Sequence, residues 1–552
     1  MRSFWLACLV GVLVEAASFP VSAQTPTLAG KVSSAEEGGM EGVLVSARRE
    51  GSNITTTVVT DEQGRFAFPT TLETGRYTLA IRAVGYRLDS PKMAELPAPG
   101  AAEPAALDLK LTRIKNVAAQ LSSGEWLLSM PGADQQKAFL TQCVGCHTLQ
   151  RVIMSTHDAD AFQQVFRRMA MYSPGSSPTH PQPLLPGPRG ERPVVTGAAA
   201  VAAAEYLAGL NMSTAETLEF PLKTLPRPKG RATKVVITEY DLPRRDAMPH
   251  DVIVDGQGNA WYSDFGSQFV GMLDPKTGKV KDIAIPVLKP EQPKGGLDLE
   301  FDPAGNIWLS MMYQAGVARI DAKTHEVKTY PFPKDWQTNS TQASMVSPNH
   351  SNVDGKVWTN NQEDHFTYRL DVASGTYENL GQAKDPSGKQ IRAYGMPTDR
   401  QNNVYQLEFG GTSIGRRDAK TGEVKIWRTP MAGSRPRRGR VDEQGRLWFA
   451  EYGGNRIAMF DPAAESIQEW MLPTPWSAPY DVVPTRSGEV WTGSMLTDQV
   501  SRLDTKSGAV VDYLLPRTTN IRRVFVDASG ARPVFWVGSN HGASIIRVEP
   551  LD

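Results

Sequence analysis

An internal repeat is the feature that most constrains the fold of this chain. A short turn that begins with aspartate recurs at Asp274, Asp321, Asp371, Asp418, Asp461 and Asp504. An aromatic residue at one strand position recurs every 43 to 50 residues, at Trp261, Trp308, Trp358, Tyr405, Trp448, Trp491 and Trp536. This period fits one blade of four short strands. Seven such repeats predict a C-terminal seven-bladed β-propeller over residues 234–552.

The ends of the repeat region predict how the ring closes. The seventh repeat stops after a third strand near Ile545–Val548, so it lacks a fourth strand. The stretch Val235–Tyr240 precedes the first repeat and has strand composition. We therefore expect it to complete the last blade, because a ring latched in this way leaves no open sheet edge.

Two stretches of the repeat region, His250–Trp261 and Gly445–Ile457, resemble the streptogramin (virginiamycin B) lyase superfamily of propellers. In those lyases histidines and glutamates hold magnesium and move a proton. Here His250 and Glu451 stand at matching positions, whereas several other blades carry unrelated residues. A lyase or hydrolase that uses His250, His350 and Glu451, with a divalent metal, is therefore one hypothesis.

The N-terminal part, residues 24–112, consists of short alternating apolar runs separated by turns, which predicts a small β-sandwich. Three of its segments, Gly42–Val45, Thr60–Phe66 and Gly75–Tyr77, resemble the carboxypeptidase-regulatory-like (transthyretin-like) domain. That resemblance implies a scaffold or adhesion module, and the segment shows no polar cluster that suggests catalysis.

The motif Cys143-Val144-Gly145-Cys146-His147 is the attachment sequence of a c-type haem. Each thiol adds to a haem vinyl group, and the histidine becomes the proximal iron ligand. A zinc site would need a second ligand pair, and no cysteine follows the motif. A thioredoxin-like pair would need a βαβ setting, which the pattern lacks. We expect one covalent haem c at Cys143, Cys146 and His147.

Helical patterns surround this motif in residues 117–212, and together they resemble a small class I cytochrome c domain. We expect helices that begin at Asp134, over 158–172 and over 197–210, the second with one apolar face that includes Met169. Met169 is the predicted distal iron ligand. Met171 should point about 200° away on the same helix. His157, His180 and an open sixth position stay as alternatives. The predicted architecture is multidomain and mainly β: sandwich, small all-α cytochrome c domain, linker at 213–233, propeller.

The first residues predict export to the periplasm. A basic start, a short apolar stretch and the site Val21-Ser22-Ala23 describe a signal peptide over 1–23 that is cleaved near Ala23. No stretch is long enough to span a bilayer. Lysine plus arginine balance aspartate plus glutamate at 59 each, so no global field favours nucleic acid or a membrane surface.

One face of the propeller gathers charged residues. The connections into the first strand of each blade and the loops after the second strand lie on the same face. The ligand-face residues predicted there are Arg392, Arg437, Arg438, Arg522 and His541. Clustered guanidinium groups match carboxylate or phosphate geometry, so we expect a site for a small anionic or oxygen-rich ligand.

Three functions follow as hypotheses. The first is a periplasmic electron-transfer cytochrome whose propeller binds a substrate or a redox partner (a cytochrome or a dehydrogenase), with a haem-linked dehydrogenase as its extension. The second is the propeller lyase or hydrolase, which leaves the haem motif unexplained. The third is a non-catalytic sensor or scaffold.

Overall fold

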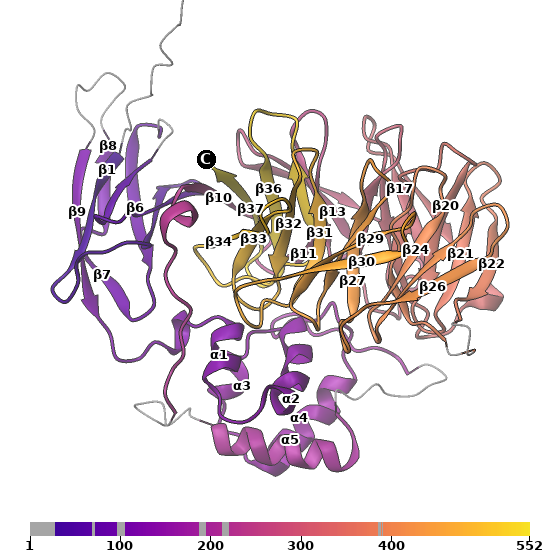
Figure 1. The fold of residues 1–552 in the computed structure, drawn as a ribbon, viewed down its shortest axis with the longest axis horizontal. Coiled ribbons are helices and arrows are strands. Elements are labelled where there is room, and N and C mark those ends of the chain that lie inside the picture. Colours follow the sequence, from indigo (N-terminus) through magenta and orange to yellow (C-terminus); the bar gives the residue numbers. More distant parts are fainter. Residues whose placement is uncertain are drawn as a thin grey trace, which may run out of the picture.

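The computed structural model describes residues 28–68, 72–96, 105–186, 195–211, 220–384, 388 and 390–552. The predicted signal peptide therefore lies outside the described residues. Figure 1 shows a β-sandwich beside a propeller, with a group of short helices below the propeller. No helix in the described part is long and apolar enough to cross a membrane.

Six four-stranded antiparallel sheets form the first six blades. Their strands are β11 (Pro249–Val254), β12 (Ala260–Asp264), β13 (Phe269–Asp274), β14 (Lys279–Ala284), β15 (Leu299–Phe301), β16 (Ile307–Ser310), β17 (Gly316–Ile320), β18 (Val327–Pro331), β19 (Ala343–Ser347), β20 (Lys356–Asn361), β21 (Phe366–Asp371), β22 (Tyr377–Gln382), β23 (Ala393–Gly395), β24 (Val404–Glu408), β25 (Ser413–Arg417), β26 (Val424–Arg428), β27 (Pro436–Val441), β28 (Leu447–Glu451), β29 (Arg456–Asp461), β30 (Ser466–Met471), β31 (Pro479–Pro484), β32 (Glu489–Ser494), β33 (Gln499–Asp504) and β34 (Val510–Leu514).

The seventh blade closes the ring in the expected way. It consists of β35 (Val524–Asp527), β36 (Val534–Ser539), β37 (Ser544–Pro550) and the early strand β10 (Val235–Asp241). Strand β10 pairs with β37 in an antiparallel register from Val235 opposite Pro550 to Asp241 opposite Ser544. The inner strands contact one another in sequence from β11 to β35, and β35 contacts β11 again. The predicted propeller closure is confirmed.

The sandwich is joined to the propeller edge to edge. The free side of β10 pairs with β4, so the last blade and half of the sandwich form one eight-stranded sheet. The sandwich strands are β1 (Leu28–Ser34), β2 (Gly38–Gly39), β3 (Leu44–Arg49), β4 (Ile54–Val59), β5 (Arg65–Ala67), β6 (Gly75–Arg82), β7 (Tyr86–Ser90), β8 (Met93–Leu96) and β9 (Ala105–Arg113). This pairing protects an edge of both units, because an unpaired strand edge invites aggregation.

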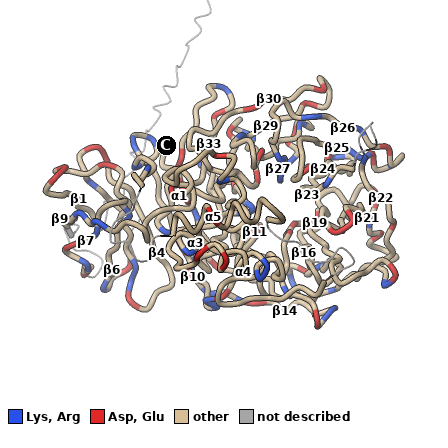
Figure 2. The backbone as a smooth tube through the Cα atoms, turned by 90° about the horizontal axis from the view of Figure 1, so that it is seen from below, with Lys and Arg blue, Asp and Glu red and all other residues tan. Residues whose placement is uncertain are grey.

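The described residues between 117 and 211, here called the helical layer, pack beneath the propeller. Their elements are η1 (Ala118–Gln120), α1 (Ser123–Ser129), α2 (Asp134–Lys137), η2 (Ala138–Gly145), α3 (Gln150–Ile153), α4 (Ala159–Ala170) and α5 (Gly197–Leu210), and η3 (Gly230–Thr233) follows in the segment that leads to β10. Seen from below in Figure 2, the helices lie over the part of the propeller near β10 and β11.

The expectation of a small all-α cytochrome c domain is wrong. The described residues contain five α-helices, three of them of seven residues or fewer, and the haem motif begins in the last residues of a 3₁₀ segment. Their apolar side chains, such as Leu140 and Phe162, share one hydrophobic cluster with Phe265 and Met495 of the propeller. Short helices, with an alanine-rich α5, bury too little surface to form a core alone, so they use the propeller face as its other half.

Candidate functional site

The haem motif forms a tight turn at the end of η2. The N–H of Cys146 donates to the carbonyl oxygen of Cys143 at 3.3 Å, which brings the two cysteines to neighbouring positions of one turn. Both thiols are free. Burial raises the pKa of Cys143 to about 12 and also raises that of Cys146, and burial lowers the pKa of His147.

Side chains of the seventh blade hold this turn in place. The side-chain amide of Asn520 donates to the carbonyl oxygen of Val144 at 3.0 Å. The Arg522 guanidinium donates to the carbonyl oxygen of Gly145 at 2.8 Å. His541 lies close by, and its burial, together with the charges of Arg522 and His147, lowers its pKa to about 3. His541 therefore stays neutral, and its neighbour Arg522 belongs to the same predicted ligand face.

A cavity of about 680 Å³ adjoins the motif and is lined by Cys143, Cys146 and His147. Apolar side chains of α4 and α5 form much of its wall, among them Phe162, Val165, Phe166, Met169 and Leu207. Tyr313, Ser340 and Gln342 of the propeller line the cavity as well. The cavity therefore lies between the helical layer and the propeller, and neither part encloses it alone.

The residues around this cavity fit a covalently attached haem. Two free thiols and an imidazole line one largely apolar cavity, which is the donor set that a c-type haem requires. The Nδ1 atom of His147 lies 3.0 Å from the carbonyl oxygen of Thr148, so the Nδ1–H tautomer can donate to it. That bond fixes the ring and leaves Nε2 as the ligating nitrogen.

The alternatives for the sixth iron position are placed differently. Met169, Met171 and His157 line the cavity, whereas His180 does not line it and lies 4.0 Å from Asp246. Met171, the C-terminal cap of α4, was expected to point elsewhere but also lines the cavity. Met169 is half-buried and Met171 is exposed. Met169 stays the predicted ligand.

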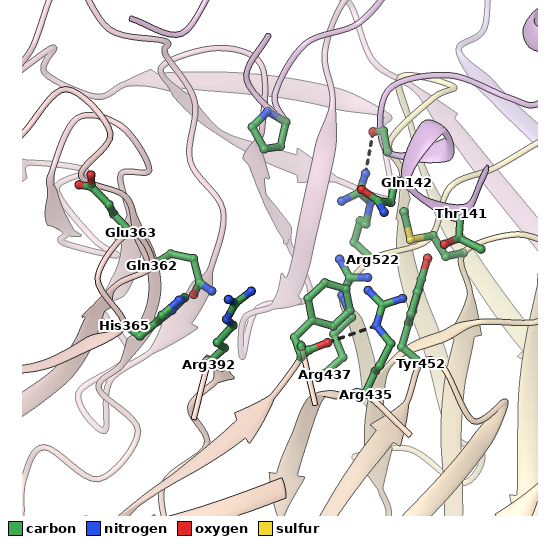
Figure 3. Close-up of a pocket in the computed structure, with 15 residues that line it drawn as sticks. Thr141, Gln142, Gln362, Glu363, His365, Arg392, Arg435, Arg437, Tyr452 and Arg522 are labelled. Carbon is green, nitrogen blue, oxygen red and sulfur yellow. Dashed lines mark hydrogen bonds between the residues drawn. The ribbon is translucent and has the colours of Figure 1, made fainter. Parts of the chain in front are cut away.

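A second cavity of about 530 Å³ lies on the same propeller face and shares Gln142, Gly145 and Pro174 with the first. It brings together Arg392, Arg437 and Arg522 of the predicted face, with Arg435 in addition (Figure 3). Arg392 precedes β23, Arg437 belongs to β27 and Arg522 precedes β35. Gln362, Glu363 and His365, between β20 and β21, line the cavity as well.

Aromatic rings surround the two central guanidinium groups. The Arg437 guanidinium lies 3.8 Å from the ring centroid of Tyr480, 4.0 Å from that of Phe409 and 4.6 Å from that of Tyr452. Arg435 shares two of these rings, at 4.4 Å from Phe409 and 5.1 Å from Tyr452. Phe409 and Tyr452 were missed in the sequence. Their signal was a repeated order of glutamate, aromatic residue and two glycines, at 408–411 and 451–454.

Arg438 has a different role from the one predicted. It points into a buried ion network at the propeller axis, where it pairs with Asp251 at 3.0 Å and also contacts Asp298. Arg523 contacts the same two carboxylates at 3.3 and 3.2 Å. Two guanidinium groups hold the pKa of Asp251 well below its usual range despite burial, which by itself would raise it. Arg438 is therefore bound within this ion network and does not line the second cavity.

The three residues of the lyase hypothesis, His250, His350 and Glu451, do not form one site. His250 is fully buried on β11, with Nδ1 2.6 Å from Asp251 and Nε2 3.2 Å from the hydroxyl of Tyr480. Glu451 is fully buried at the end of β28, where burial and the neighbouring Glu469 raise its pKa to about 8.

His350 lies at the other end of its blade, contrary to the predicted face. Strand β19 runs from Ala343, opposite Asn361, to Ser347, opposite Trp358, and His350 follows its end. His250, in contrast, starts its blade beside Pro249, opposite Asp264. Within the described ranges, no group of three or more His, Cys, Asp or Glu side chains could hold a metal ion. The divalent-metal alternative therefore has no ligand set there.

Comparisons with known protein families support the presence of the sandwich and of the propeller. Residues 387–551 match the virginiamycin B lyase family, and residues 27–112 match the carboxypeptidase regulatory-like domain. Both resemblances are thereby confirmed. No curated relative matches the chain.

Similar solved structures cover the propeller part. Virginiamycin B lyase from Staphylococcus aureus is 18% identical, with a TM-score of 0.49 over 57% of this chain and 99% of that chain. A streptogramin B lyase is 19% identical, with a TM-score of 0.49 over 58% and 99%. YCF48 bound to D1 peptide is 12% identical, with a TM-score of 0.44 over 57% and 97%.

Proposed function

We propose that this protein is a periplasmic electron carrier that holds one covalent haem c between its helical layer and its propeller. Cys143 and Cys146 would form the thioether links, and His147 would bind the iron. The observation that supports this proposal is the 680 Å³ cavity that both thiols and the imidazole line. Its redox partner would be a periplasmic cytochrome or dehydrogenase.

The haem supplies a one-electron couple when bound, and the protein sets its potential. Asn520 and Arg522 fix the motif from the propeller side through the carbonyl oxygens of Val144 and Gly145. The apolar side chains of α4 would shield one side of the haem from water. A thioether ligand from Met169 would raise the potential and favour electron transfer over ligand chemistry at the iron.

Potentiometric titration of the purified full chain, followed by visible spectra, tests this role. We expect sharp low-spin α and β bands on reduction, one reversible one-electron transition and reduction by a partner dehydrogenase. A chain that carries haem but shows a high-spin spectrum that shifts with carbon monoxide would contradict an electron-carrier role. Turnover of a small substrate that reduces the haem would extend the role to a haem-linked dehydrogenase.

A lyase is the second candidate, because residues 387–551 match the virginiamycin B lyase family. The burial of His250 and the distance of His350 from that end of the blade argue against it. Metal-dependent turnover without a change in the haem spectrum would establish this candidate in place of electron transfer. Ligand binding without any turnover would instead establish a sensor.

A further inference from the structure

The second cavity carries more positive charge than its surroundings neutralise. Four arginines line it, Arg392, Arg435, Arg437 and Arg522, against one carboxylate, Glu363. None of the four forms an ion pair with an Asp or Glu in the part of the chain that the structure describes. Their neighbours Arg438, Arg440 and Arg523, in contrast, are all ion-paired.

The carboxylate of Glu363, the one acid of this lining, is held by two hydroxyl groups. It accepts hydrogen bonds from the hydroxyls of Thr338 and Ser340, both at 2.5 Å. Arg437 is more than nine-tenths buried, and its Nε has no hydrogen-bond partner among the described residues. Burial and the nearby charge of Arg437 lower the pKa of Arg435, whereas the nearby tyrosines raise the pKa of Arg437. The aromatic rings stabilise these cations but leave the edges of the guanidinium groups for a ligand.

The cationic groups stand at two sides of the cavity. Figure 3 shows Arg392 beside Gln362 and His365 on one side, and Arg435, Arg437 and Arg522 on the other. The rings of Phe409 and Tyr452 lie on the second side. A volume of about 530 Å³ exceeds what a single inorganic oxyanion fills and lies in the range of small-molecule sites.

We propose that this cavity binds a small organic acid with two carboxylates, one held by Arg392 and the other by Arg437 and Arg522, with its body against Phe409 and Tyr452. Guanidinium groups bind carboxylates through paired hydrogen bonds, and aromatic walls select an organic body over phosphate. Binding itself needs only the cavity. Its coupling to electron transfer rests on the proposed function, because the ligand would lie against the Gly145 turn.

Isothermal calorimetry of the purified full chain tests the binding, with terephthalate, succinate, benzoate and inorganic phosphate as probes. We expect the dicarboxylates to bind at least tenfold more tightly than benzoate or phosphate. Arg392→Gln should weaken dicarboxylates about tenfold and leave benzoate nearly unchanged, because it removes one end of the site. Arg437→Gln should weaken all carboxylates. Arg486→Gln, at an exposed surface pair with Glu443, is the matched control and should change nothing.

Equal affinity for phosphate and the dicarboxylates, no heat with any carboxylate, or unchanged binding by Arg392→Gln would overturn the proposal. Because Arg392 is exposed, its replacement does not endanger folding. A potentiometric titration with the dicarboxylate adds a second readout, for which we expect a lower haem potential. Binding in a chain without haem would leave this inference standing and reject the proposed function, whereas haem without binding would do the reverse.

Discussion

The Arg522 guanidinium donates a hydrogen bond to the carbonyl oxygen of Gly145, 2.8 Å away, and thereby ties the seventh blade to the haem motif. This contact joins two residues that are 377 positions apart in the chain. It places a positive charge beside the turn that carries Cys146. Under the proposed function, the propeller would form part of the haem environment.

Removal of this charge should lower the haem potential, because a nearby cation favours the reduced, less positive iron. For Arg522→Gln we expect a decrease of about 40 mV, which corresponds to ~1 kcal/mol for a one-electron couple. Arg522→Lys keeps the charge and should keep most of the potential. The haem potentials of both variants are measured by potentiometric titration. An equal decrease of the potential in both variants, or no decrease in either, would refute an electrostatic effect of Arg522.

The sixth ligand can be assigned by three single variants. Met169→Ala should convert the ferric haem to a high-spin, carbon monoxide-binding form and lower its potential, because it removes a thioether ligand. Met171→Ala and His157→Ala also alter the cavity lining and serve as matched controls that keep the low-spin spectrum. A high-spin spectrum in either control, with an unchanged Met169→Ala, would reject Met169 as the ligand.

Glu451 should make the stability of the propeller depend on pH. The pKa of Glu451 is about 8 in the folded protein, against an ordinary value of 4.5. Between these two pH values the folded state therefore keeps a proton that the unfolded state has lost. Stability should therefore fall as pH rises from about 4.5 to 8. Glu451→Gln should flatten this part of the curve of melting temperature against pH, as measured by differential scanning fluorimetry. A variant with the slope of the parent chain would show that Glu451 ionises normally.

The ion network at the axis should be essential for the propeller. Asp251→Asn leaves Arg438 and Arg523 with less buried counter-charge, and breaking a buried pair costs about 3–5 kcal/mol. Glu443→Gln breaks the exposed pair with Arg486 and should cost less than ~1 kcal/mol. Denaturant titration followed by tryptophan fluorescence compares the two variants. Similar midpoints would mean that the network does not stabilise the ring.

The repeat could be recognised in the sequence because its cause is local. The indole Nε1 of Trp261 donates to the carboxylate of Asp255 at 2.8 Å, and Trp448 donates to Asp442 at the same distance. The two residues of each pair are only six positions apart. Every blade with this hydrogen bond therefore repeats an aspartate that is followed six residues later by a tryptophan. The closure of the ring by β10 could be predicted because the seventh repeat lacks a fourth strand in the sequence.

Long-range contacts explain what the sequence did not predict. The pairing of β10 with β4 joins the sandwich to the propeller. Each of these units has a complete strand pattern of its own in the sequence, so neither pattern predicts a contact with the other. The helical layer was predicted as an all-α domain because its helices are local, whereas its shared core with the propeller is not. His350 looked equivalent to His250, but β19 ends at Ser347 and places it at the opposite end of the blade.

Denaturing mass spectrometry of the full chain, expressed with haem-attachment machinery, tests whether Cys143 and Cys146 carry a covalent haem. We expect one haem mass on the polypeptide after denaturation, retained by Met169→Ala and lost in Cys143→Ser/Cys146→Ser. A polypeptide of unmodified mass from a well-folded, correctly exported protein would show that no haem is attached and would leave the propeller with a role without haem.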